Sequence, residues 1–306
     1  MKAAQTLHKT HNGTANPLHM TRMALPDGRE AAHALDATLI YPAGGLDGFD
    51  DVASPDLYDI PAPIDAPEIP LDLTVVKWVA KAAAKKDIRY CLNGIYLDAA
   101  QGKIVGTDGH RIHVADCPAL TDSEHSVIIP SDSIKILMQL HIDQGKPPVT
   151  VKVDSKGVWL QVGDAELYAR AIDGRYPDWP RVIPGESYLT QIDYDIPAMA
   201  KKHKAAARML IERENARAIR EAIPGTKPSK RPLYDAHFEF EHDGSMVLGD
   251  GTVIATTQNA AFESRRGIAA DYAIDASIKG AICMMDSDKF LVKGDDRIAV
   301  VMARRV

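Results

Sequence analysis

The sequence has few cysteines, no long apolar run and no excess of positive charge. Its three cysteines, Cys91, Cys117 and Cys283, are too few and too scattered for a disulfide framework or a thiolate metal site, and they favour a reducing compartment. No stretch approaches the roughly 18 consecutive apolar residues that a membrane span needs, and the first residues contain no apolar signal core. We therefore expect a folded, cytoplasmic protein without a membrane segment.

The formal net charge is −6, which rules out a surface that is basic overall. Any contact with nucleic acid must therefore come from a local basic face. The chain has 306 residues, of which 45% are apolar, so it can bury real cores. This length suits two ordinary domains, or two with a partial third.

Residues 1–66 differ in composition from the rest of the chain. They are rich in Gly, Pro, Asp and Ala, with one convincing extended run at 34–41 and a stretch at 44–67 that is typical of a loop. We interpret this region as an appendage or a reduced first domain. The alternative is a poorly ordered leader with one hairpin.

An internal repeat begins after this region. Residues 73–85 align without gaps to 196–208, and each segment follows a short alternating strand. A second pair has the same plan, because strand 127–130 leads into helix 133–137 and strand 272–275 leads into helix 277–281. With the short alternating runs between them, these segments predict an α+β fold of two domains, 67–186 and 187–306, each with two helices on antiparallel strands. The second domain opens with a longer helix, predicted at 197–222.

The opening helices of both repeats are basic. Lys77, Lys81 and Lys85 recur every four residues and so share one helix face, and Lys201 and Lys204 continue the pattern in the second repeat. Solvated helix faces are often rich in lysine, which is the simpler interpretation. Equivalent basic helices in an acidic protein nevertheless favour contact with nucleic-acid phosphates, independent of base sequence.

Four separated segments carry a resemblance to a known family. Residues 87–98, 107–112, 126–130 and 171–184 occur in the order and spacing of the middle domain of the beta sliding clamp, the DNA polymerase III beta subunit. The last domain resembles the family weakly, through 298–306, and residues 1–66 hardly at all. The chain thus resembles a shortened and divergent clamp.

The resemblance implies a DNA-clamp fold and a ring that encircles double-stranded DNA as a processivity factor. Such a subunit is non-catalytic and needs no cofactor or metal. Its implied partners are a DNA polymerase, other clamp-motif proteins and a clamp loader. The ring would be a homo-oligomer: three copies of a two-domain chain, or a dimer if residues 1–66 supply a reduced first domain.

The resemblance also implies a groove for partner peptides, between the middle and last domains. An apolar floor with Arg and His at the rim suits a short peptide with apolar anchors. Carried over position by position, the groove residues are Leu92, Thr107, Gly109, His110, Arg111, Ile112, Pro177, Arg181, Val182, Val300 and Met302. The chain departs from the family at Ala303 and Arg304, which leaves the peptide preference of the groove open.

The DNA-facing set combines the basic helices with the resemblance. It consists of Lys77, Lys81, Lys85, Lys86, Arg89, Tyr90, Lys201 and Lys204. A second departure concerns this set, because the family often carries basic residues after Pro130, where this chain has Ser131 and Asp132. DNA contact at that point is therefore in doubt.

Three other interpretations stay open. Asp108, His110 and Arg111 resemble an acid–base cluster, but nothing nearby completes a catalytic set. His8 and His11 have a spacing that suits a metal, although such a pair is usually solvated. A clamp fold that closes no ring could act as an accessory or decoy that binds clamp-motif peptides, possibly encoded by a phage.

Overall fold

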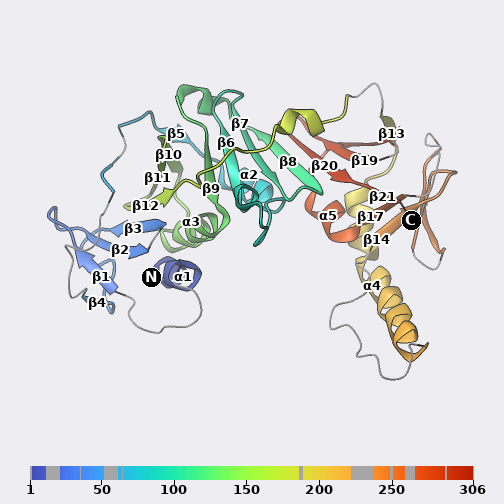
Figure 1. Cartoon of the computed structure of the whole chain (residues 1–306), viewed down its shortest axis with the longest axis horizontal. Coiled ribbons are helices and arrows are strands. Elements are labelled where there is room, and N and C mark those ends of the chain that lie inside the picture. Colours follow the sequence, from blue (N-terminus) through green and yellow to red (C-terminus); the bar gives the residue numbers. More distant parts are fainter. Residues whose placement is uncertain are drawn as a thin grey trace. The chain divides into compact units, whose positions relative to one another are not determined.

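The computed structural model describes residues 2–11, 21–34, 36–51, 61–63, 65–185, 189–221, 237–248, 251–258, 266–286 and 288–305. The chain divides into two compact units (Figure 1). Unit 1 comprises 1–109 and 114–177, and unit 2 comprises 110–113 and 178–306. None of the helices in the described ranges has the length and apolar character needed to cross a membrane.

The first sheet of unit 1 joins strands from the N-terminal region to strands of the middle region. Its order is β4-β1-β2-β3-β12-β11-β10-β5. The central junction is antiparallel, with Leu39 opposite Leu167. The strands are β1 (Thr21–Ala24), β2 (Glu30–Ala34), β3 (Ala37–Tyr41), β4 (Asp50–Asp51), β5 (Ile69–Pro70), β10 (Val149–Val153), β11 (Gly157–Val162) and β12 (Ala165–Arg170). The described part of residues 1–66 is therefore built into unit 1 by backbone pairing.

The second sheet of unit 1 carries the helices that shape the candidate site. Its order is β8-β7-β6-β9, and its strands are β6 (Gly94–Asp98), β7 (Lys103–Thr107), β8 (Arg111–Asp116, whose first residues belong to unit 2) and β9 (Val127–Pro130). The helices are α1 (Lys2–His11), α2 (Leu73–Ala80) and α3 (Ser131–Asp143), with short 3-10 turns η2 (Tyr90–Leu92) and η3 (Pro118–Asp122). A β-carbon at Gly106 would lie 2.5 Å from the Val79 carbonyl oxygen, so glycine lets α2 approach β7 closely. Helix α1 packs on α3.

The described part of unit 2 contains two α-helices and two groups of strands. The strand orders are β13-β18-β19-β20 and β16-β15-β14-β17-β21. The elements are η4 (Trp179–Val182), β13 (Thr190–Ile192), α4 (Ile196–Glu221), β14 (His237–Phe240), β15 (Ser245–Val247), β16 (Val253–Thr256), β17 (Arg266–Ala269), α5 (Ala270–Asp275), β18 (Ile282–Met285), β19 (Lys289–Lys293), β20 (Arg297–Met302) and β21 (Arg304–Arg305). Helix α4 packs against α5.

The structure confirms the long opening helix of the second repeat and corrects three other elements. Within the extended run predicted at 34–41, residues 37–41 form β3 as predicted, whereas Ala34 ends β2 and pairs with Ala37. The strand predicted at 272–275 is wrong, because this segment lies in α5; the following segment, 277–281, is not helical. Helix α2 ends at Ala80, so residues 81–85 do not continue it. The domain boundaries at 66/67 and 186/187 stay a prediction.

Candidate nucleic-acid and partner-binding surfaces

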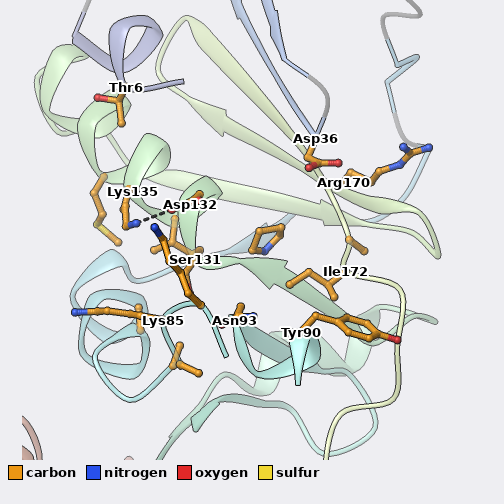
Figure 2. Close-up of a pocket in the computed structure, with 18 of the residues that line it drawn as sticks. Thr6, Asp36, Lys85, Tyr90, Asn93, Ser131, Asp132, Lys135, Arg170 and Ile172 are labelled. Carbon is orange, nitrogen blue, oxygen red and sulfur yellow. Dashed lines mark hydrogen bonds and ion pairs between the residues drawn. The ribbon is translucent and has the colours of Figure 1, made fainter. Parts of the chain in front are cut away.

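Unit 1 contains a hollow of ≈ 1180 Å³ beside α2 and α3, here called the basic hollow. In Figure 2, Lys85 and Lys135 lie at one end of the hollow and Tyr90 and Arg170 at the other. Its cationic lining residues are Lys77, Lys81, Lys85, Lys86, Lys135 and Arg170, and its carboxylates are Asp36, Asp132 and Asp173. Six cations against three carboxylates make this surface positive in a chain whose net charge is −6.

The lysines reach the hollow because α2 buries its opposite face. Asp72 caps the helix, since its carboxylate accepts a hydrogen bond of 2.7 Å from the Thr74 N–H. Val75, Val76 and Val79 are buried, whereas Lys77 is exposed. The repeat of apolar positions thus decides which side chains face water.

The chain turns sharply after α2 and still keeps its lysines in the hollow. Residues 82–84 are three buried alanines, and the Ala84 N–H donates to the Leu92 carbonyl at 2.9 Å. Lys86 has a φ of 58°, which reverses the chain. Lys81 and Lys85 remain exposed lining residues. The sequence predicted that Lys77, Lys81 and Lys85 share one face of a single helix. This prediction was wrong about the helix, because α2 ends at Ala80, but all three lysines line the basic hollow.

Two cations of the hollow were missed by the sequence reasoning. Lys135 lies on α3, and Arg170 ends β12. The Lys135 ammonium lies 2.5 Å from a carboxylate oxygen of Asp132, one turn earlier on α3. Asp132 is thus partly neutralised within its own helix. The helical spacing around the buried Ile134 could have shown that Lys135 lies on the exposed side of α3. No pattern in the sequence indicates that Arg170 lies near α2.

Arg89 lies in the loop at 87–93, apart from the cations that line the basic hollow. The Asn93 side chain closes the loop, because it accepts from the Asp87 N–H at 2.8 Å and donates to the Asp87 carbonyl at 2.9 Å. Arg89 does not line the hollow. Its guanidinium donates two hydrogen bonds to the Asp87 carboxylate and one to the Asp108 carbonyl, and the bond to Asp87 holds the pKa of Arg89 above its ordinary value. Tyr90 is exposed and lines the hollow.

A tyrosine pair fixes the segment that follows β12. The Tyr176 ring stacks on Tyr96, with centroids 4.8 Å apart, and its hydroxyl donates to the Val105 carbonyl at 3.4 Å. Burial raises the pKa of Tyr176 above its ordinary range. The Ile172 N–H donates to the Ile128 carbonyl at 2.9 Å. These contacts hold the residues after Arg170, including Ile172 and Asp173, against the hollow.

The two predicted cations on α4 lie in different environments. Lys201 is exposed. Lys204 forms an ion pair with Asp271 of α5, and only 31% of its side chain is exposed. Lys202 and Arg208 are exposed and were left out of the predicted DNA-facing set.

Unit 1 contains four of the predicted groove residues. Leu92 and Thr107 are buried, and the Thr107 hydroxyl accepts from the Gly109 N–H at 3.1 Å. Gly109 has a φ of 87°, and a β-carbon there would lie 2.8 Å from the Arg89 guanidinium. Gly109 and Pro177 are both exposed. They are therefore the accessible members of the predicted groove in this unit.

Unit 2 contains the other seven predicted groove residues. Its exposed members include two apolar side chains, Val182 at 43% and Met302 at 39%. Ile112 and Val300 are buried in the core. The Met302 N–H donates to the His110 carbonyl at 2.8 Å, which ties segment 110–113 to the end of β20. The remaining residues are Arg181, exposed on η4, and Arg111.

Arg111 is held inside unit 2 instead of standing at a rim. Its guanidinium lies 2.9 Å from the Asp275 carboxylate and 4.2 Å from the centre of the Tyr272 ring. Only 10% of the Arg111 side chain is exposed. An ion pair and a cation–π contact thus position this arginine on α5. Tyr272 and Asp275 were missed, because the sequence placed them in a strand.

The structure gives no support to a metal site in the part of the chain that it describes. Within those residues, no group of three or more His, Cys, Asp or Glu side chains is arranged to hold an ion. The side chains of His8 and His11 lie outside the described residues.

Part of the chain is similar in sequence to known proteins of one family. Residues 73–178 match the family model for the DNA polymerase III beta subunit, central domain. The beta sliding clamp of Salmonella typhimurium is 29% identical over 200 residues, which cover 60% of this chain and 54% of the relative. That of Escherichia coli K12 is 31% identical over 172 residues, or 52% and 46%. Over this part the chain is similar to the beta sliding clamps.

The clamp fold extends beyond the part with detectable sequence identity. The beta chain of DNA polymerase III from Streptococcus pneumoniae superposes with a TM-score of 0.62 over 92% of this chain and 77% of that one, at 18% identity. At this identity the likeness shows the fold alone. The prediction of an α+β DNA-clamp fold is therefore confirmed, although the sequence match covers only about half the length of the curated clamp relatives.

Proposed function

We propose that this clamp-family chain is a non-catalytic processivity factor that encircles double-stranded DNA. The basic hollow carries the proposal, because it concentrates cations on one surface of an acidic protein. Lysine and arginine contact phosphates without reading bases, as a protein that slides along a duplex requires. Lys77, Lys81, Lys85 and Lys86, with Lys135 and Arg170, are the proposed DNA-facing residues of unit 1, and Tyr90 lies at their edge.

The proposal includes closure of a ring as a homo-oligomer in the cytoplasm. Three copies or two copies would form the ring, and a clamp loader would open it. Mass in solution, measured by light scattering during size-exclusion chromatography, tests closure. A stable trimer or dimer is expected. A monomer that still binds clamp-motif peptides would instead indicate an accessory or decoy protein.

We also propose that unit 2 presents anchoring positions for the clamp-motif peptide of a polymerase or another partner. Val182 and Met302 supply exposed apolar surface, and His110 supplies an exposed polar group. Arg111 has a positioning role in this proposal, since its charge is engaged by Asp275. Arg181 remains exposed at the side of Val182.

Retention on circular DNA tests the DNA role. The chain is loaded on nicked circular plasmid, and the bound fraction is followed before and after the plasmid is cut. The double variant Lys81→Glu with Lys85→Glu is expected to reduce retention at least tenfold, because two contacts with phosphates become repulsive. Lys156→Glu with Lys279→Glu is the matched control, since both lysines are exposed and lie outside the hollow. Equal retention of the two double variants would contradict the proposed role of the hollow.

A further inference from the structure

Helix α4 is longer than the fold of unit 2 requires. It runs for 26 residues, from Ile196 to Glu221. Its buried side chains, among those described, are Ile196, Pro197, Ala200 and Ala207. In Figure 1 its first turns lie beside α5, and its other end extends away from the strands of this unit. The 14 residues after Ala207 continue the helix for about 21 Å.

The exposed side chains of α4 form one continuous stripe. With 3.6 residues per turn, the eight exposed positions fall within an arc of about 140°, opposite the buried positions. They are Lys201, Lys202, Ala205, Arg208, Met209, Glu212, Arg213 and Ala216. This set has four cations and one carboxylate, and it includes Met209, which is 70% exposed. Here the set is called the α4 stripe.

A helix that no core covers needs another reason to be stable and to carry its charges. The stripe continues beyond the last buried residue, so Arg208 and Arg213 do little to hold unit 2 together. Along the axis, Lys201, Arg208 and Arg213 are separated by roughly 10 Å and 8 Å. A row of cations at such intervals on a rod is complementary to the regularly spaced phosphates of a duplex.

We propose that the α4 stripe binds the phosphate backbone of duplex DNA through Arg208 and Arg213, in a contact that does not require encirclement. The proposal extends the DNA role of this family member to a part of the helix that the clamp fold leaves uncovered. It differs from the proposed ring function, because a convex stripe can reach linear DNA from outside. The contact is independent of base sequence and weakens as salt rises.

Binding to a short linear duplex tests this inference. A fluorescent duplex of 30 base pairs is titrated with the full chain, by anisotropy, between 50 and 200 mM salt. Arg208→Gln with Arg213→Gln keeps good helix formers and removes two cations. We expect affinity to fall roughly tenfold at the lowest salt, and the slope of log K against log salt to decrease by about 1.8.

The control is Lys156→Gln with Lys279→Gln, which removes the same charge from exposed positions outside the stripe. Circular dichroism establishes that α4 is intact in both variants. Equal affinities and equal salt slopes for both double variants would overturn the inference. Binding that depends on the stripe with vesicles of phosphatidylserine and phosphatidylcholine, but not with duplex, would also overturn it in favour of a membrane partner.

The two proposals fail separately. If the ring proposal is wrong and the stripe proposal is right, the α4 variant still loses affinity for linear duplex, while the Lys81→Glu and Lys85→Glu variant is retained on circular plasmid like its control. If the stripe proposal alone is wrong, retention depends on the hollow and linear binding is unchanged by the α4 variant.

Discussion

Helices α2 and α4 open the two repeats with related sequences, yet they present their cations in different ways. Helix α2 has eight residues, five of them buried, and the chain then turns back so that Lys81 and Lys85 line a hollow. Helix α4 continues for 26 residues, and its exposed cations include Lys201, Lys202, Arg208 and Arg213. The same Lys/Ala pattern therefore lines a hollow in one unit and lies on an exposed helix face in the other.

The difference arises from what each helix buries. Valine and tryptophan side chains anchor α2 to its sheet, and the alanines at 82–84 are drawn into the core by the turn that follows. Among the α4 side chains that the structure describes, the buried ones after Pro197 are alanines, and no glycine or proline follows Pro197 in the helix. Alanine has the highest helix propensity, so the local sequence favours a long helix here.

The largest expected effect tests the close packing that sets α2 apart from α4. Gly106→Ala places a β-carbon against the Val79 carbonyl, so α2 must shift. We expect the free energy of unfolding to fall by roughly 3 kcal/mol. Urea denaturation followed by tryptophan fluorescence measures it. Ala205→Val, at an exposed position of α4, is the comparison and should cost only about 0.6 kcal/mol; similar midpoints for both variants would contradict the packing argument.

A change at the exposed apolar surface of unit 2 should affect binding more than stability. Val182→Asp puts a carboxylate where a peptide's apolar anchor would lie, and we expect affinity for a clamp-motif peptide to fall by about 2 kcal/mol, or some thirtyfold. Calorimetric titration gives the value. Val253→Asp, at another exposed valine of the unit, is the control. Peptide binding that survives Val182→Asp unchanged would place the partner surface elsewhere.

The ion pair of Arg111 offers a smaller and more local test. Asp275→Asn removes the charge that faces the guanidinium but keeps the size of the side chain, and we expect the loss of a charged contact of about 1.5 kcal/mol in unfolding free energy. Peptide affinity should weaken with it if Arg111 positions segment 110–113. A loss of stability with unchanged peptide affinity would limit Arg111 to a structural role.

The smallest effect concerns the junction of α1 and α3 in unit 1. Burial of Asp143 acts to raise its pKa, but hydrogen bonds from the Ala3 N–H and from Gln139 outweigh it, so the pKa lies below the ordinary value of 3.8. The lowered pKa adds stability above the unfolded-state pKa, which is lost as pH falls through the folded-state pKa. Asp143→Asn should cost about 0.5 kcal/mol at pH 7 and reduce the loss of stability below pH 4. Thermal unfolding from pH 3 to 7 measures both; identical pH profiles would show that Asp143 does not anchor α1.

Much of the fold could be predicted from particular residues. The gap-free repeat led to α2 and α4, and the four clamp-like segments led to the family and the α+β class, which are both confirmed. The errors lie where alternation is ambiguous. The run at 272–275 alternates like a strand but lies in α5, and the run at 34–41 contains the end of β2 as well as the whole of β3.

The amino-acid sequence by itself determined which segments form the repeats, how many cations each carries and which family they resemble, because these depend on local spacing and on the order of motifs. Only the tertiary structure decided which cations share a surface. Arg170 comes to α2 through β12 and its sheet, Arg89 turns toward Asp87, and Lys204 is engaged by Asp271. Such neighbours are brought together by strand pairing and packing between distant segments, and no local pattern of residues records them.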